Sequence, residues 1–162
     1  MKKFLCGLLI AAAMLGLAAC GKADDHPKED ETVESVSQLQ TYRVYLPNDN
    51  ADGFVVETAC TAVISAETVL RELKNREVLP AAVTVNGFRM DNGLITLDFN
   101  QAFADVVCAM GTSGELMIVG SVVNTFLDAF QAETVYFTVD GQILESGHTV
   151  YDFAMPFFSV EP

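Results

Sequence analysis

The stretch that decides the fold is Val83-Thr-Val-Asn-Gly-Phe-Arg-Met-Asp-Asn-Gly-Leu-Ile-Thr-Leu-Asp-Phe99. Near its middle, Asn92-Gly93 separates two runs of alternating character, and both residues accept the positive φ that a two-residue hairpin turn requires. The apolar residues of the second run share one face of a strand: Ile95, Leu97 and Phe99. The stretch therefore predicts an antiparallel β-hairpin with one buried face.

Upstream of this hairpin the sequence predicts two more strands and a helix. Tyr42 to Leu46 alternates, and a turn cluster at 48–53 leads into a run rich in β-forming residues at 54–63. The turn begins like a calcium loop, but Ala59 stands where the twelfth-position Glu ligand belongs, which favours a plain hairpin turn. Ser65 is a good N-cap for the following helix, and Pro80 stops that helix.

Downstream, residues 100–109 read as a short helical or irregular segment. Thr112-Ser-Gly-Glu115 matches a capping box and opens a largely buried helix that runs to Phe130. A last strand at 134–139 ends in the turn pair Asp140-Gly141, and a short return strand or arm follows. The order is ββαββαβ, which predicts an α+β fold: a small mixed or antiparallel sheet with two helices packed on one face.

The front of the chain has the features of an export signal. Two lysines, an apolar run at 4–17 and the small residues Leu17-Ala-Ala-Cys20 follow one another, and the apolar run is too short to span a bilayer. Leu17 to Cys20 resembles the bacterial lipobox, in which the cysteine thiolate accepts lipid. We therefore expect residues 1–19 to be a lipoprotein signal peptide and Cys20 to be the lipid attachment site. An ordinary signal peptide is the alternative.

The residues after Cys20 predict a tether that leads to one folded domain. Residues 20–41 are rich in like charges and poor in large apolar residues, which favours an extended acidic linker. The acidic cluster around His26 fits a solvated linker better than a metal site, because nothing fixes the geometry of its ligands. We expect the domain to span 42–158 and to sit on the outer face of the cell membrane, held by lipid on Cys20.

The charge balance excludes several classes of partner. The 162 residues carry 9 Lys and Arg against 22 Asp and Glu, a net charge of −13. Nucleic acid is therefore not an expected partner, because binding to phosphates needs a basic footprint. Docking of the acidic protein on anionic headgroups is disfavoured for the same reason.

Residues that could support catalysis do not form a recognisable set in the sequence. Cys60 and Cys108 lie in apolar contexts without flanking cations, and His148 is the only histidine outside the tether. Candidate carboxylates are present but cannot be placed together from the sequence: Asp98, Asp105 and Glu115. We therefore expect no enzyme, cofactor or metal site. Cys60 and Cys108 form a disulfide or remain as two buried thiols, and the sequence leaves both states open.

Several segments resemble one known family. They are Leu94-Ile-Thr-Leu-Asp-Phe-Asn-Gln-Ala-Phe103, Gly111-Thr-Ser-Gly-Glu115 with its helix, Val135-Tyr-Phe-Thr-Val-Asp-Gly141, and Gly147-His148. They are similar to the motifs of the GerMN domain, found in sporulation and spore-germination proteins and in many exported lipoproteins. The resemblance covers roughly Tyr42 to Phe157. The family in turn resembles the ring-building domains of secretion-type assemblies, which act by protein contacts and have no known catalytic residues.

Three functions follow as hypotheses. The first is a non-enzymatic lipoprotein that assembles or stabilises an envelope complex by protein contact, self-association included, in sporulation, germination or the vegetative envelope. The second is a solute- or glycan-binding lipoprotein with an aromatic stacking surface drawn from Tyr42, Tyr45, Tyr136, Tyr151, Phe153, Phe157 and Phe158. The third is a hydrolase, which would require His148 and a carboxylate to converge in a pocket.

Overall fold

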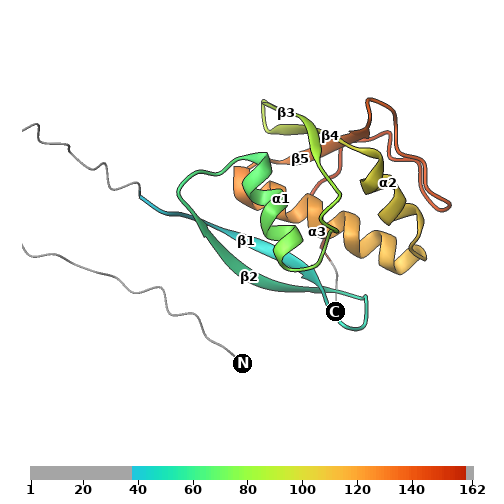
Figure 1. Cartoon of the computed structure of the whole chain (residues 1–162), viewed down its shortest axis with the longest axis horizontal. Coiled ribbons are helices and arrows are strands. Elements are labelled where there is room, and N and C mark those ends of the chain that lie inside the picture. The colour runs from blue at the N-terminus through green and yellow to red at the C-terminus, as the bar shows by residue number, and fades with distance from the viewer. Residues whose placement is uncertain (1–37, 160–162) are drawn as a thin grey trace, which may run out of the picture. The chain divides into compact units, whose positions relative to one another are not determined.

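The computed structural model describes residues 38–159, which hold five strands and three helices (Figure 1). The elements are β1 (Gln40–Pro47), β2 (Phe54–Thr61), α1 (Ala66–Asn75), β3 (Val85–Asp91), β4 (Leu94–Phe99), α2 (Gln101–Cys108), α3 (Thr112–Phe130) and β5 (Thr134–Val139). The predicted α+β class is confirmed. The expected signal peptide at 1–19 and the expected lipid attachment site Cys20 lie outside the described residues, as does most of the expected tether. Strand β1 begins at Gln40, two residues before the expected start of the domain.

The central sheet contains three strands in the order β3-β4-β5. β3 and β4 are antiparallel, and their turn is formed by Asn92 at φ 46° and Gly93 at φ 79°, which confirms the predicted hairpin. β4 and β5 are parallel, because α2 and α3 carry the chain back across the sheet between them. The sheet is therefore mixed. The segment at 100–109, which the sequence left as helical or irregular, forms the third helix, α2.

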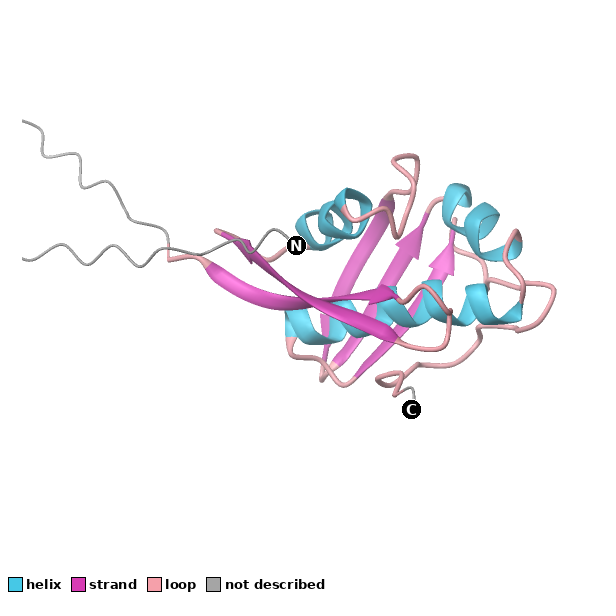
Figure 2. Cartoon of the chain, turned by 90° about the horizontal axis from the view of Figure 1, so that it is seen from below, coloured by secondary structure: helices cyan, strands magenta, loops and turns pink. Residues whose placement is uncertain are grey.

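The core lies between this sheet and the helices (Figure 2). Alternate residues of β4 and β5 are buried, and helix residues from α1, α2 and α3 belong to the same apolar cluster. Phe99 stacks on Phe103 at 4.3 Å between ring centroids, and Phe137 packs edge-on against both rings. Because the helices share one core with one set of strand residues, they cover one face of the three-stranded sheet.

Strands β1 and β2 form a separate two-stranded sheet, so the prediction of a single sheet is wrong in this detail. The reason lies at the edge of β1 that faces away from β2. There the backbone N–H of Arg43 donates to Asp128 Oδ1 at 2.7 Å, and that of Tyr45 donates to Thr125 Oγ1 at 3.1 Å. Side chains of α3 thus take the hydrogen bonds that another strand would have taken, and the sheet ends there.

Of the two helix caps predicted from the sequence, one is confirmed and one is wrong. Ser65 caps α1 as predicted, in a capping box with Thr68. The capping box predicted at Thr112 is wrong, since the N-cap of α3 is Gly111 and no side chain caps it. Glu115, which should have completed the box, instead accepts hydrogen bonds from Ser146 and Tyr151. A tertiary contact has replaced the local one.

The C-terminal arm, residues 142–159, follows the predicted turn at Asp140-Gly141, where φ is 46° and 74°. It contains no named strand and is joined to the domain by isolated bridges, such as Val135 with Met155. Near its end, Asn124 on α3 donates from Nδ2 to the carbonyl of Phe158 at 3.0 Å and accepts from the N–H of Phe158 at 2.7 Å. The arm is therefore fixed to both the sheet and α3.

Candidate functional site: interaction surfaces

A buried carboxylate links α3 to the C-terminal arm. Glu115 is 2% exposed, and its Oε1 accepts from Tyr151 Oη and from Ser146 Oγ, each at 2.6 Å. Burial, followed by the hydrogen bond and charge of Glu115, raises the pKa of Tyr151, so its hydroxyl stays a donor. The arrangement holds the arm in place, because the hydroxyls of Ser146 and Tyr151 both donate to Oε1 of Glu115.

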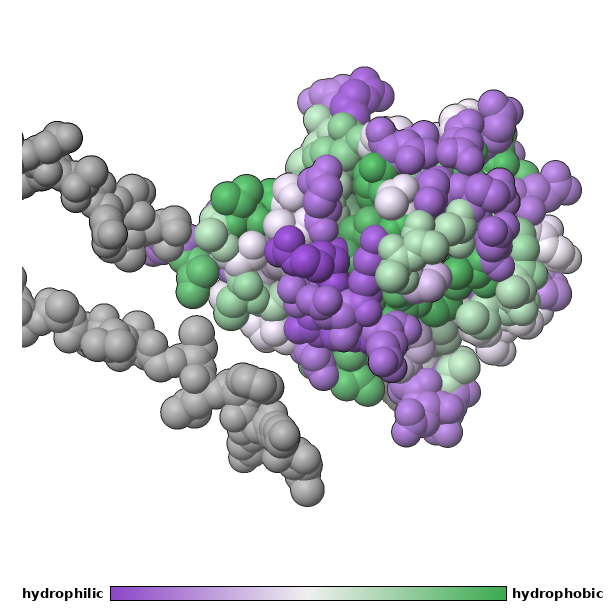
Figure 3. Space-filling view, viewed as in Figure 1, coloured by the Kyte–Doolittle hydropathy of each residue, from purple (hydrophilic) through white to green (hydrophobic). Residues whose placement is uncertain are grey.

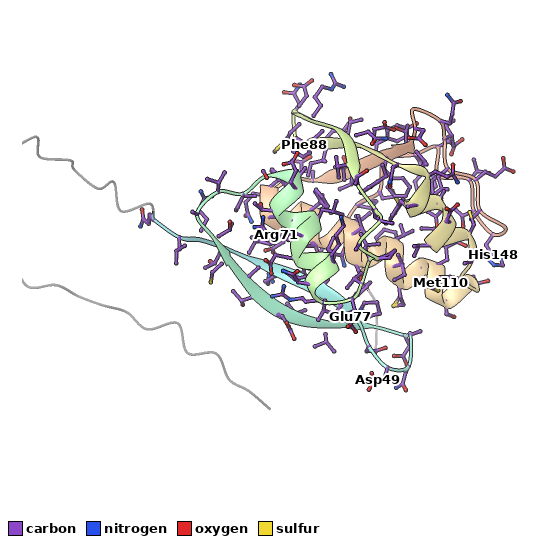
Figure 4. The ribbon with its side chains drawn as sticks, in the orientation of Figure 1. Asp49, Arg71, Glu77, Phe88, Met110 and His148 are labelled. Atoms are coloured by element: carbon purple, nitrogen blue, oxygen red, sulfur yellow. The ribbon has the colours of Figure 1, made fainter. Side chains whose placement is uncertain are left out.

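The hydrolase hypothesis is not supported by the position of His148. Its backbone N–H donates to Ser146 Oγ at 3.0 Å, while the residue is exposed and lies on the peripheral loop of the arm (Figure 4). Ser121, buried within α3, has an Oγ without a hydrogen-bond partner. Within residues 38–159, no hydrogen bond or ion pair joins the side chains of His148 or Ser121 to Glu115 as in a nucleophile and base set.

The other candidate carboxylates lie apart from Glu115 and have structural partners. Asp98 Oδ1 accepts from Thr138 Oγ1 at 2.6 Å and from the N–H of Gly141 at 2.8 Å, and these bonds lower the pKa of Asp98. Asp105 accepts from Gln101 on the same helix at 3.1 Å. Within residues 38–159, no three His, Cys, Asp or Glu side chains are grouped so that they could hold a metal ion.

The two cysteines of the domain are free and exposed. Cys60 lies on β2, and Cys108 ends α2 with its Sγ 3.8 Å from the carbonyl of Glu145. The structure therefore has neither of the two states expected from the sequence, a disulfide or a pair of buried thiols.

Three of the seven aromatic residues considered for a stacking surface are buried, and two, Tyr136 and Phe158, are half-buried. Tyr42, Tyr45 and Tyr151 are buried, whereas Phe153 and Phe157 are exposed. Phe157 packs edge-on against Tyr45 and borders an open hollow of about 280 Å³. The hollow is lined by Arg43, Leu127, Asp128, Gln131, Ala132, Glu133 and Phe157. Its polar lining supplies hydrogen-bond donors and acceptors beside one exposed ring.

A regular surface lies on the sheet face opposite the helices. Strand register places Arg89, Thr96 and Tyr136 in one row across β3, β4 and β5, and Asp91, Leu94 and Thr134 in the next. We call these six residues the open sheet face. The four residues that β4 and β5 contribute to this face are half-buried, whereas the residues next to them within each strand are fully buried. Alternation predicts an outward face but does not reveal that no helix or strand of residues 38–159 covers it.

The open sheet face continues to the outer edge of β3, which pairs with no other strand of residues 38–159. β3 is the outer strand of its sheet, and six of its seven residues are exposed. On the opposite side, β5 is bridged by Met155 of the C-terminal arm. An unpaired strand edge beside a flat sheet face is a surface on which another polypeptide can dock by main-chain hydrogen bonds.

None of the helices within residues 38–159 has the length and apolar character needed to cross a membrane.

Comparison with known proteins identifies related sequences and folds. A family model described as Germane, sporulation and spore germination, matches residues 28–145. The solved tandem GerMN domains of the sporulation protein GerM from Bacillus subtilis align with a TM-score of 0.54 at 20% identity, over 74% of this chain and 46% of that chain. The chain thus spans about half the length of that structure. At this level of identity the likeness shows a shared fold and nothing further.

Two further solved structures are similar over three quarters of the chain. The first GerMN domain of GerM from Bacillus subtilis has a TM-score of 0.47 and 20% identity, over 75% of this chain and 96% of that chain. A candidate lipoprotein from Clostridium perfringens has a TM-score of 0.44 and 9% identity, over 75% and 89%. The curated proteins contain no match to the chain.

Proposed function

The chain belongs to the Germane (GerMN) family of sporulation and spore germination proteins, and from this premise we propose that it is a lipid-anchored, non-enzymatic envelope protein that acts by protein contact. In this proposal Cys20 carries the lipid, residues 20–41 form the tether, and the domain works on the outer face of the cell membrane. The proposed setting is sporulation or germination, in keeping with the family description. The proposed partners are other envelope proteins or a second copy of the chain.

The observation that carries the proposal is the open sheet face together with the unpaired edge of β3. All three helices of the described domain lie on one face of the mixed sheet, as is usual in an α+β fold, so the other face is available for contact. The six residues of the face are neutral apart from Arg89 and Asp91, whose charges are opposite, and Asp98 continues the same side of β4 with its carboxylate bonded to Thr138. A sheet face with few charges suits contact with another protein.

The chemistry of the domain points in the same direction. Its one buried carboxylate, Glu115, is used to hold the C-terminal arm, and Asp98 is used to hold a turn. Groups that catalysis would need are therefore engaged in the architecture of the described domain. The surface features that remain available are suited to binding.

A crosslinking experiment tests the proposal. A photoreactive residue at Thr96, in the middle of the open sheet face, is expected to capture a discrete neighbour in membranes of cells at the stage when the protein is made. The matched control places the same residue at Asp105, exposed on α2 in the helix layer. Capture at neither position, with the protein running as a solitary domain by size measurement, would contradict a role in protein contact. Equal capture at both positions would contradict the assignment to this face.

Solute or glycan binding is a second candidate, supported by the hollow beside Phe157. There an exposed ring lies next to Arg43, Gln131 and Glu133, which supply donors and acceptors to a polar ligand. A thermal-shift screen of sugars and cell-wall fragments tests this candidate. A hit that raises the midpoint of unfolding and disappears in Phe157→Ala supports it. A screen without such a hit counts against it.

A further inference from the structure

The open end of the β1–β2 hairpin projects from the domain. This end, which we call the hairpin tip, comprises residues 38–41 and 60–64: the beginning of β1, the end of β2 and the start of the loop to α1. Both ribbon views show it extending beyond the helices (Figures 1 and 2). The tip is also the place where the chain that leads from Cys20 enters the domain.

The hairpin tip carries the most exposed large apolar side chains of residues 38–159. Val63 is 62% exposed and Leu39 is 59% exposed, and they are joined there by the exposed Ala62. In the space-filling view, hydrophobic colour gathers at this end of the domain (Figure 3). Two such side chains on one projecting end differ from the single apolar residues found on any protein surface.

The tip is also free of charge, although the domain is strongly acidic. Residues 38–42 and 58–66 contain no Asp, Glu, Lys or Arg, whereas residues 38–159 contain fifteen acidic and five basic residues. A membrane with anionic headgroups repels the acidic body of the domain and does not repel a neutral tip. The distribution of charge therefore leaves one end of the domain able to approach such a surface.

The backbone N–H and carbonyl of Val63 have hydrogen-bond partners within the protein. The N–H donates to Thr61 Oγ1 at 3.4 Å, and the carbonyl accepts from Thr61 Oγ1 at 2.9 Å and from Thr68 Oγ1 at 3.1 Å. Because these polar groups already have partners within the protein, the side chain of Val63 can leave water without exposing unpaired backbone groups to an apolar surrounding.

We propose that the hairpin tip lies against the lipid bilayer, with Leu39 and Val63 in the interfacial region. The proposal rests on the lipid anchor at Cys20 proposed above. Eighteen residues separate Cys20 from Leu39, and a chain of that length reaches at most about 60 Å, so the tip stays within reach of the membrane at all times. Tethering raises the effective concentration of the tip at the bilayer, so two apolar side chains suffice for contact.

The two exposed cysteines provide a matched test. In the lipidated chain, a polarity-sensitive fluorophore is attached to Cys60 at the tip in Cys108→Ser, and to Cys108 at the end of α2 in Cys60→Ser. The proteins are placed on phosphatidylcholine vesicles with and without brominated acyl chains. We expect the label at Cys60 to shift to shorter wavelength and to be quenched by the brominated lipid. The label at Cys108 should show neither effect.

Substitutions locate the contact. Val63→Glu is expected to abolish the shift and the quenching at Cys60, while Ile143→Glu, at a similarly exposed residue of the C-terminal arm, leaves them intact. Unchanged circular dichroism shows that each variant is folded. Loss of the signal in both variants, or in neither, would overturn the proposal.

The outcomes separate this inference from the proposed function. Mass measurement and flotation with vesicles report the anchor independently of the fluorophore. A chain that floats and carries lipid but gives no shift at Cys60 overturns the membrane contact and leaves the anchored protein intact. A chain without lipid that fails to float overturns the proposed anchoring itself. A shift at Cys60 that depends on protein concentration and not on vesicles identifies a second copy as the occupant and overturns the inference.

Discussion

Asp128 on α3 accepts two hydrogen bonds from Arg43 on β1, one from the backbone N–H and one from Nε, each at 2.7 Å. The carboxylate thereby serves β1 as a neighbouring strand would, and it also pairs with the guanidinium. Its side chain is 10% exposed, whereas that of Arg43 is 63% exposed. The backbone bond is therefore the more shielded part of the contact.

This asymmetry predicts unequal costs for removing the two partners. Asp128→Ala leaves the N–H of Arg43 without its acceptor and should lower the free energy of unfolding by about 2 kcal/mol. Arg43→Ala keeps the backbone bond and loses only a solvent-exposed ion pair, so its cost should be clearly smaller. Urea denaturation of both variants measures the difference. Equal losses would contradict the strand-like role of Asp128.

The contact between Glu115 and Tyr151 should stabilise the C-terminal arm. Glu115→Ala removes the acceptor of two hydroxyls in a buried site, and we expect a loss of about 3 kcal/mol in the free energy of unfolding. Tyr151→Phe removes one donor and should cost about 1 kcal/mol. Hydrogen exchange should show faster exchange in the arm in Glu115→Ala. Protection of the arm equal to that of the unmodified chain would refute the assignment.

The hydrogen bonds to Asp98 predict a stability that depends on pH. Because they hold the folded pKa of Asp98 below its unfolded value, the contribution of Asp98 is fully present above the unfolded pKa of about 3.9 and is lost as pH falls through the lower folded value. Asp98→Asn should therefore be less stable than the unmodified chain at pH 7, by about 1 kcal/mol. The difference should shrink as the solution is acidified below about pH 4.

Thermal unfolding at neutral and acidic pH measures this difference. Asp105→Asn serves as the control, because Asp105 is exposed and its bond is to a neighbour one turn away on α2. A gap between Asp98→Asn and the unmodified chain that stays constant across this range would show that the charge of Asp98 does not contribute.

The exposed thiols predict a simple chemical result. Both Cys60 and Cys108 should react with an alkylating reagent in the folded protein, and the intact mass should be the same with and without reductant. A difference of two hydrogen atoms on reduction would reveal a disulfide. Alkylation that requires denaturant would indicate buried thiols.

Local patterns were sufficient for most of the elements. Asn92-Gly93 fixes the β3–β4 turn because both residues sit at positive φ, and the alternation through Phe99 fixes which face of β4 is buried. Ser65 fixes the start of α1 because its partner, Thr68, is three residues away. In each case the interaction that decides the structure lies within a few residues of the chain.

The candidate surfaces were less accessible to prediction. That Phe157 is exposed while Tyr42 and Tyr45 are buried depends on which elements pack over each ring, and aromatic character is the same in all three. The free thiols and the open sheet face have the same origin. The exposure of a side chain depends on which elements pack against it, and those elements come from distant parts of the chain.

The sequence by itself determined the α+β class, the hairpin at Asn92-Gly93 and the family to which the chain belongs. Only the tertiary structure decided that the strands divide into two sheets, because the edge of β1 is closed by Asp128 and Thr125, more than 75 residues away. It also decided that Glu115 binds the C-terminal arm instead of capping α3. A carboxylate accepts hydrogen bonds from whichever donors the fold brings within reach, and no local pattern contains those donors.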